Sequence, residues 1–229
     1  MYKKIVFVLA LLSIVSQFSC GTIIAPIDFE SVATKFVTDF RPLFPDEGPL
    51  SMDNEFLGKL AIPTATYLDS VRHFHHVYSA ELKQFDRGVL PAATLKNVQK
   101  VDNILQSMGN FLTDYPHNPQ RFNVLNGFKR ITKADYASDD YRAKTLLSKL
   151  EQVPLFYETA KQCLNAVNRQ AADAAVEQHL ATFLFFEKEL PLFFEKNGQL
   201  TPPQYQAKIE AAKLAIKDYV AFVESFRLN

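Results

Sequence analysis

Three polar residues in the first third of the chain have the types and spacing of metal ligands. Asp69, His73 and His76 are separated by four and three positions, so they share one face of a helix. Two imidazoles and a carboxylate could hold Zn²⁺, and such a site would support a metal-dependent hydrolase. The alternative is a solvated helix face with an Asp–His pair, because one helix rarely supplies a complete metal site. We favour this alternative and predict no metal and no cofactor.

The remaining histidines are weaker candidates. His75 falls on the apolar face of the same helix and is expected to be a hydrogen-bonded core residue. His117 lies in a proline-rich corner, and His179 is isolated on a later helix. We predict no catalytic residues.

A cluster of carboxylates near residue 190 also admits a simple explanation. Each glutamate has a lysine nearby, so surface ion pairs are expected. A glycosidase-like pair would need two carboxylates across a cleft, which sequence cannot place. The sequence contains no glycine-rich phosphate loop and no G-x-S-x-G elbow. The residues concerned are Glu187, Glu189 and Glu195, with Lys188 and Lys196.

Four phenylalanines in the same stretch exceed what one buried helical stripe needs. Phe185, Phe186, Phe193 and Phe194 form two Phe-Phe-Glu-Lys copies eight residues apart, a spacing that turns the second copy by about 80° on a straight helix. Either this helix is central in the fold, or some rings line a groove for a partner or an apolar ligand.

The N-terminal residues resemble an export signal. Lys3 and Lys4 precede an apolar run over 5–15, which is too short to be a membrane-spanning helix. Small residues flank Cys20, as in the signal of a bacterial lipoprotein, although Gln17 stands where such signals have leucine. We predict lipidation of Cys20, with palmitate among the acyl chains. The alternative is an ordinary cysteine beyond a conventional cleavage site, in a soluble periplasmic or secreted protein.

This interpretation divides the chain into a signal peptide (1–19), a lipid-anchor tether (20–27) and a single domain (28–229). The protein is then exported to the bacterial cell envelope, and Cys20 attaches it to the membrane. Basic and acidic residues balance at 25 each, so no nucleic-acid partner is expected. Cys163, the second cysteine, is expected to be buried and unreactive.

Apolar residues recur with helical spacing throughout, and no stretch of useful length alternates as a strand would. We predict an all-α fold, a single bundle of about six or seven helices with proline-marked corners. Pro154 lies inside the pattern of 141–164, so it should kink that helix or break it into two. The expected helical segments are 28–40, a region from about Ser51 that is cut again at Pro63, 63–85, 91–112, 122–128, 141–164, 171–196 and 202–226.

The centre of the chain resembles the N-terminal half of family 885 among bacterial domains of unknown function. The corner Asn118-Pro119-Gln120-Arg121-Phe122 matches a family pattern, and a helix with an Arg-x-x-x-Leu-Leu-x-x-Leu-x-x-Val-Pro-x-x-Tyr pattern follows over 142–157. The resemblance covers about half of the chain and implies a helical scaffold. Full-length relatives carry a later, zinc-peptidase-like half with an HExxPGHH motif. This chain has no HExxH motif, so the resemblance transfers no metal-binding or catalytic residue.

These observations favour a non-enzymatic envelope lipoprotein that serves as a helical binding or scaffold module. Its partner would be an envelope protein or an apolar ligand, besides the membrane reached through Cys20. The competing hypothesis is the metal-dependent hydrolase that uses the face of Asp69, His73 and His76.

Overall fold

The computed structural model describes residues 28–197 and 200–227, and within these ranges the chain is all-α without a strand. This confirms the predicted fold class. The predicted signal peptide and tether, including Cys20, lie outside the described residues. Within the described ranges, no helix combines the length and the apolar character that crossing a membrane requires.

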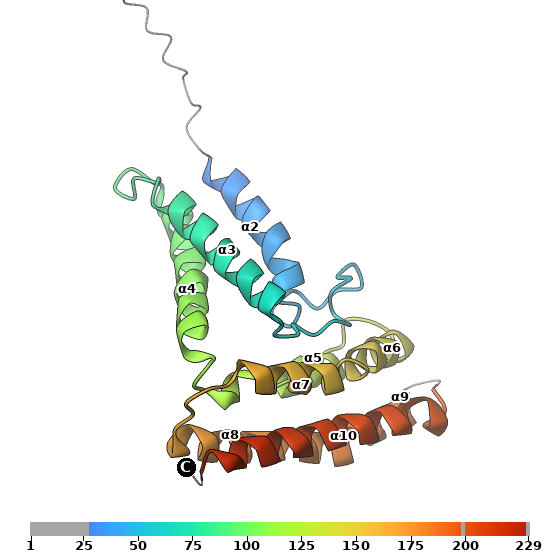
Figure 1. Ribbon diagram of the computed structural model, residues 1–229. Helices are drawn as coiled ribbons and strands as arrows, with labels where there is room; N and C mark the ends of the chain where they lie inside the picture. The colour runs from blue at the N-terminus through green and yellow to red at the C-terminus, as the bar shows by residue number, and fades with distance from the viewer. Residues whose placement is uncertain (1–27, 198–199, 228–229) are drawn as a thin grey trace, which may run out of the picture.

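The first three helices form an arm (Figure 1). They are α2 (Phe29–Leu43), α3 (Ala65–Leu82) and α4 (Ala92–Asp114). As predicted, Asp28 caps α2, where its carboxylate accepts hydrogen bonds from the backbone N–H groups of Glu30 and Ser31. The arm has its own core of buried side chains: Phe29, Val32, Phe36, Val71, Phe74, Tyr78, Leu82, Val98, Leu105 and Met108.

The segment 44–64 connects α2 to α3 without forming a helix, so the predicted helical region beginning near Ser51 is wrong. Local polar contacts explain the difference. Asn54, which is buried, donates from its side chain to the carbonyl of Pro49 at 2.9 Å. Its side-chain oxygen accepts from the N–H of Phe56 at 3.2 Å. Such side-chain bonds to the backbone compete with helix formation.

A layer of three helices lies across the end of the arm (Figure 1). It contains α5 (Leu125–Lys133), α6 (Asp139–Leu150) and α7 (Val153–Cys163). The predicted helix over 141–164 is therefore broken into two, one of the outcomes expected from Pro154. The proline lies in the first turn of α7, where its missing N–H costs nothing.

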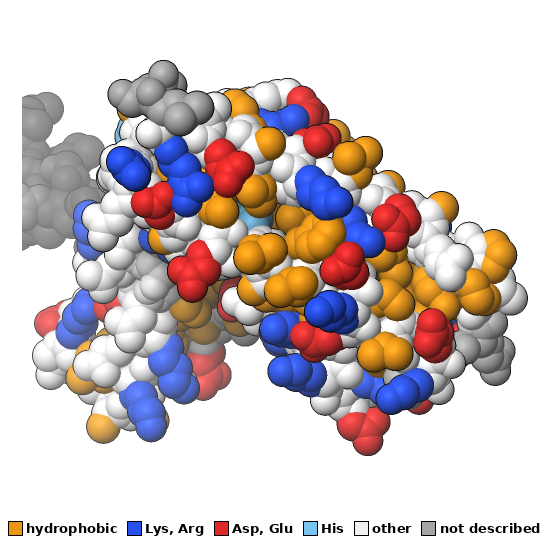
Figure 2. Space-filling model, turned by 90° about the horizontal axis from the view of Figure 1, so that it is seen from below, with side chains coloured by type: hydrophobic (Ala, Val, Ile, Leu, Met, Phe, Trp, Pro, Cys, Tyr) orange, Lys and Arg blue, Asp and Glu red, His pale blue; other side chains and the backbone are white. Residues whose placement is uncertain are grey.

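The second layer is formed by α8 (Arg169–Leu184), α9 (Leu190–Asn197) and α10 (Pro202–Ser225). A π-helical segment, Phe185–Glu189, joins α8 to α9, and the N–H of Leu190 donates to the carbonyl of Phe185. Thr201 and Gln204 form a capping box at the start of α10. Figure 2 views the molecule from below, the side on which α8 and α10 lie in Figure 1, and hydrophobic side chains alternate there with charges of both signs.

Candidate functional site

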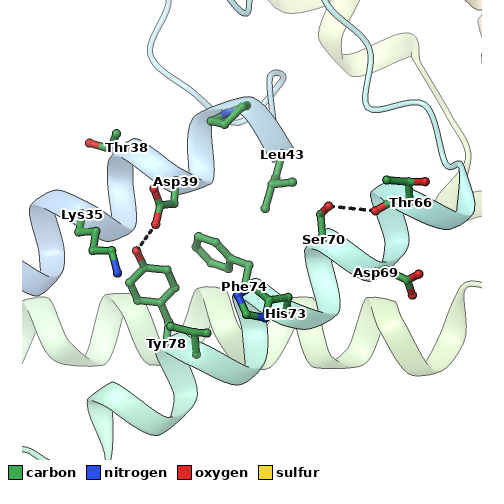
Figure 3. A pocket seen from close by; sticks show the side chains of 12 residues that line it. Lys35, Thr38, Asp39, Leu43, Thr66, Asp69, Ser70, His73, Phe74 and Tyr78 are labelled. Carbon is green, nitrogen blue, oxygen red and sulfur yellow. Dashed lines mark hydrogen bonds between the residues drawn. The ribbon is translucent and has the colours of Figure 1, made fainter.

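A groove of about 610 Å³ runs between α2 and α3 (Figure 3). Its floor is apolar, because Phe74 and Tyr78 are buried in the arm core and Leu43 and Val77 are half-buried. Its rim is polar on both helices. The lining residues are Lys35, Thr38, Asp39, Pro42, Leu43, Thr66, Asp69, Ser70, His73, Phe74, Val77 and Tyr78.

One end of the groove is organised by a tyrosine–aspartate pair. The hydroxyl of Tyr78 donates to a carboxylate oxygen of Asp39 at 2.6 Å (Figure 3). Burial raises the pKa of Tyr78 above its usual range, and the hydrogen bond to Asp39 and that residue's charge add to the effect. The ammonium of Lys35 lies 5.9 Å from the centre of the same ring. Tyr78 therefore remains a neutral donor that holds the two helices together.

Asp69 and His73, two of the three residues of the alternative metal-site hypothesis, also line the groove. Figure 3 places Asp69 toward the other end and His73 between the two ends, beside Phe74. Arg72 pairs with Asp69 at 2.6 Å and also donates to the hydroxyl of Tyr115 at 2.9 Å. His76 is exposed and does not line the groove. Over residues 28–197 and 200–227, no three His, Cys, Asp or Glu side chains are grouped so that they could hold a metal ion. Asp69, His73 and His76 are exposed, and Asp69 forms its ion pair with Arg72.

The four phenylalanines around the π-helical segment are buried core residues, as the central-helix interpretation expects. Phe185 and Phe193 also line a shallow pocket between α5 and α9. Phe185, Phe186 and Phe194 are at most 1% exposed and Phe193 is 8% exposed. Phe186 packs edge-on against Phe128, and Phe194 stacks on Tyr205.

The nearby carboxylates lie on the surface, as expected for ion-pairing residues. Glu187, Glu189 and Glu195 are exposed. Glu187 pairs with a lysine on another helix, Lys213 of α10, at 3.8 Å. An exposed pair at this distance contributes little to stability.

His179 has surroundings that its place in the sequence did not indicate. It is fully buried, and its Nδ1 and Nε2 atoms lie 2.7 and 2.8 Å from the carbonyl oxygens of Ala175 and Phe122. Rings of Tyr157 and Tyr219 flank it. A neutral imidazole carries one N–H and can donate to only one of the two oxygens at a time. Burial lowers the pKa of His179, although both carbonyls act in the opposite direction.

His179 therefore fastens α8 to the proline corner that carries the family resemblance. Two neighbouring contacts hold the same region, one from α10 and one from α8. Tyr219 donates from its hydroxyl to the carbonyl of Pro119 at 2.9 Å, and the side chain of Asn123 donates to the hydroxyl of Thr182 at 2.9 Å. His179 thus connects segments that lie far apart in the sequence, which is a structural role. His75 is half-buried and His117 is exposed, with Nδ1 3.1 Å from the carbonyl of Asn165.

An ion pair between a buried lysine and a half-buried aspartate joins the segment after α2 to the first layer. Lys149 of α6 is fully buried, and its ammonium lies 2.7 Å from a carboxylate oxygen of Asp46 in the α2–α3 segment. It also donates to the carbonyl of Lys59 at 2.5 Å. Burial lowers the pKa of Lys149, while Asp46 opposes this shift. Cys163 is half-buried. Its thiol donates to the carbonyl of Pro63 at 3.1 Å, and burial raises the pKa of the thiol.

Comparison with known proteins adds a fold relationship. No protein-family model matches the sequence, and no curated protein matches it. A solved structure from Shewanella oneidensis, described as "a putative lipoprotein of unknown function", matches with a TM-score of 0.73 and 22% identity. The match covers 87% of this chain and 37% of the Shewanella chain. The likeness shows a shared fold, over little more than a third of that protein's length.

Proposed function

We propose that this protein is an exported, lipid-anchored helical module that binds an envelope partner in the groove between α2 and α3. The observation that carries the proposal is the groove itself, in which an apolar floor lies below a polar rim. The floor would contact apolar side chains of the partner, and the rim would provide hydrogen bonds, the division of roles typical of binding sites.

The rim favours binding over a chemical step. Three of its groups with possible acid, base or nucleophilic roles already have partners within the protein. Asp39 accepts from Tyr78, Asp69 is paired with Arg72, and the hydroxyl of Ser70 donates to the carbonyl of Thr66 at 2.9 Å. Such groups can recognise a ligand without being activated for catalysis.

The membrane anchor and the family relationship are part of the same proposal. The residues around Cys20 support the anchor, and the description of the Shewanella protein as a lipoprotein is in keeping with it. We also propose that the helices correspond to the helical half of family 885. The support is the motif over 142–157, together with the match of 87% of this chain to 37% of a longer protein.

Site-specific photo-crosslinking in native cells tests the groove. We would place benzoylphenylalanine at Ser70, which is exposed on the groove rim, and at Leu214, which is 60% exposed on α10 as a matched control. We expect a light-dependent adduct of defined mass at Ser70 that is absent at Leu214. Thr38→Trp, which fills the groove from the α2 side, should remove it. Identical adducts at both positions, or an adduct unaffected by Thr38→Trp, would refute the groove as the binding site.

A further inference from the structure

The free end of the arm brings the start of α2 next to the loop between α3 and α4. Figure 1 shows both at the same end of the arm, away from the two layers. The rings of Phe29 and Phe85 meet edge to face, with centroids 5.6 Å apart. This contact fixes the loop beside the point at which the described chain begins.

The loop presents an apolar side chain to solvent. Val89 is 76% exposed, the highest value among the exposed large hydrophobic side chains of the described residues. A tight turn holds it there. The carboxylate of Asp86 accepts from the N–H of Gly88 at 2.9 Å, and the carbonyl of Asp86 accepts from the N–H of Val89 at 3.3 Å.

The loop and its flanks carry charges of both signs, of which one basic side chain is suited to a membrane surface. Arg87 pairs with Asp102 of α4 at 2.7 Å, which neutralises one acidic group near the tip. Asp86 is occupied by the turn. Lys83 is exposed and free to point outward, and a basic side chain beside an apolar one is suited to the surface of an anionic bilayer.

The length of the tether limits how far this loop can be from a membrane. Asp28 lies eight positions after Cys20, and an extended chain spans at most about 3.6 Å per residue, or about 29 Å in all. If Cys20 carries the lipid, as in the proposed function on which this inference rests, the start of α2 stays within that distance of the bilayer surface.

We propose that the α3–α4 loop rests on the bilayer, with Val89 in the interface and Lys83 at the level of the headgroups. One valine cannot anchor a protein, so the acyl chains provide attachment and the loop provides orientation. The α2–α3 groove then opens near the membrane surface, because the 15 residues of α2 rise only about 22 Å. The layers containing α8 and α10 face away from the bilayer.

Tryptophan fluorescence tests this contact, because the chain contains no native tryptophan. Val89→Trp and the control Leu214→Trp each create a single reporter at an exposed position. The acylated full-length variants would be reconstituted on vesicles of phosphatidylethanolamine and phosphatidylglycerol with brominated acyl chains. We expect a blue shift and quenching of the emission from Val89→Trp, and neither change for Leu214→Trp. Circular dichroism would verify that both variants keep the native helical content.

Co-sedimentation with the vesicles separates this inference from the anchor. If the protein sediments with vesicles but the emission of Val89→Trp is unshifted and unquenched, the loop contact is refuted and the anchor stands. Equal quenching of both reporters would also refute the proposed orientation. If the protein with its native N-terminus does not sediment with vesicles, both the anchor and the loop contact are refuted.

Discussion

At the scale of single residues, the buried imidazole of His179 should make stability depend on pH. Burial holds its pKa below the usual 6.5, so the unfolded chain binds this proton more readily than the folded one. The contribution is fully present above about pH 6.5 and is lost as the pH falls through the lower folded value. We therefore expect the free energy of unfolding, measured in urea, to decrease on acidification from neutral pH.

The control is His179→Phe, which keeps a ring in the cavity and removes the titration. Its unfolding free energy should be lower at neutral pH, because the carbonyl of Phe122 loses its partner; an unsatisfied buried acceptor costs about 1–3 kcal/mol. Its decrease on acidification should be smaller than that of the wild type. Parallel pH profiles for the two proteins would show that His179 does not titrate as its surroundings imply.

Gly127 should tolerate no side chain, although it lies within helix α5. Alanine in place of a helical glycine normally stabilises by about 1 kcal/mol. A Cβ at Gly127, however, would collide with the carboxylate of Asp46, the partner of Lys149. Gly127→Ala should thus lower the free energy of unfolding. In an Asp46→Ala background the same change should be neutral or stabilising, and chemical denaturation of all four proteins measures the difference.

The sequence predicted residue roles only where neighbours along the chain determine them. The helix cap at Asp28 could be predicted, because it depends only on the residues that directly follow it. His179 was judged isolated, because Phe122 lies 57 residues away. The burial of Lys149 depends on segment 44–64, which lies about 90 residues earlier. The sequence does carry one signal for this burial, because Lys149 lies between Leu146 and Val153 on the inward side of the predicted helix.

At the scale of helices, the break between α6 and α7 should not depend on Pro154 alone. Gln152 lies at the break, donates to the carbonyl of Gly58 at 2.7 Å and accepts from the N–H of Leu60 at 3.0 Å. The proline is in a first turn, where it carries no penalty. Pro154→Ala should therefore change the free energy of unfolding by less than about 1 kcal/mol, rather than gaining the roughly 3 kcal/mol expected in a helix interior. A gain of that full size would show that α6 and α7 are held apart by the proline.

Phe156 and Leu155 offer a matched test of the inward face of α7. Phe156 is 7% exposed and Leu155 is 55% exposed. Phe156→Ala should cost about 3–5 kcal/mol, and Leu155→Ala should cost less than about 1 kcal/mol. Equal effects in thermal or chemical unfolding would mean that the face is assigned wrongly.

The π-helical segment shows why the sequence left the phenylalanine pairs unresolved. On a straight α-helix the second pair would be turned by about 80° from the first, which favoured different environments for the two. The structure widens the helix at Phe185–Glu189, just before Pro191, whose missing N–H cannot continue the regular pattern. The local widening, a feature that periodicity does not encode, lets both pairs reach the core.

At the scale of the whole molecule, apolar periodicity predicted helices but not their division into an arm and two layers. Each helix presents a similar stripe, so the pattern does not specify which helices share a core. Segment 44–64 links the arm to the first layer, because its carbonyl groups accept hydrogen bonds from Lys149 and Gln152. These polar contacts across long sequence separations give the arm its position, and with it the place of the α2–α3 groove relative to the proposed tether.

The proposed role and orientation both depend on export and lipid anchoring at Cys20. The intact mass of the protein extracted from native membranes tests this anchoring most directly. We predict a mature N-terminus at Cys20 that carries two or three acyl chains. A Cys20→Ser variant should be neither acylated nor retained in the membrane fraction. An unmodified N-terminus beyond Cys20, in protein recovered from the soluble fraction, would contradict this prediction.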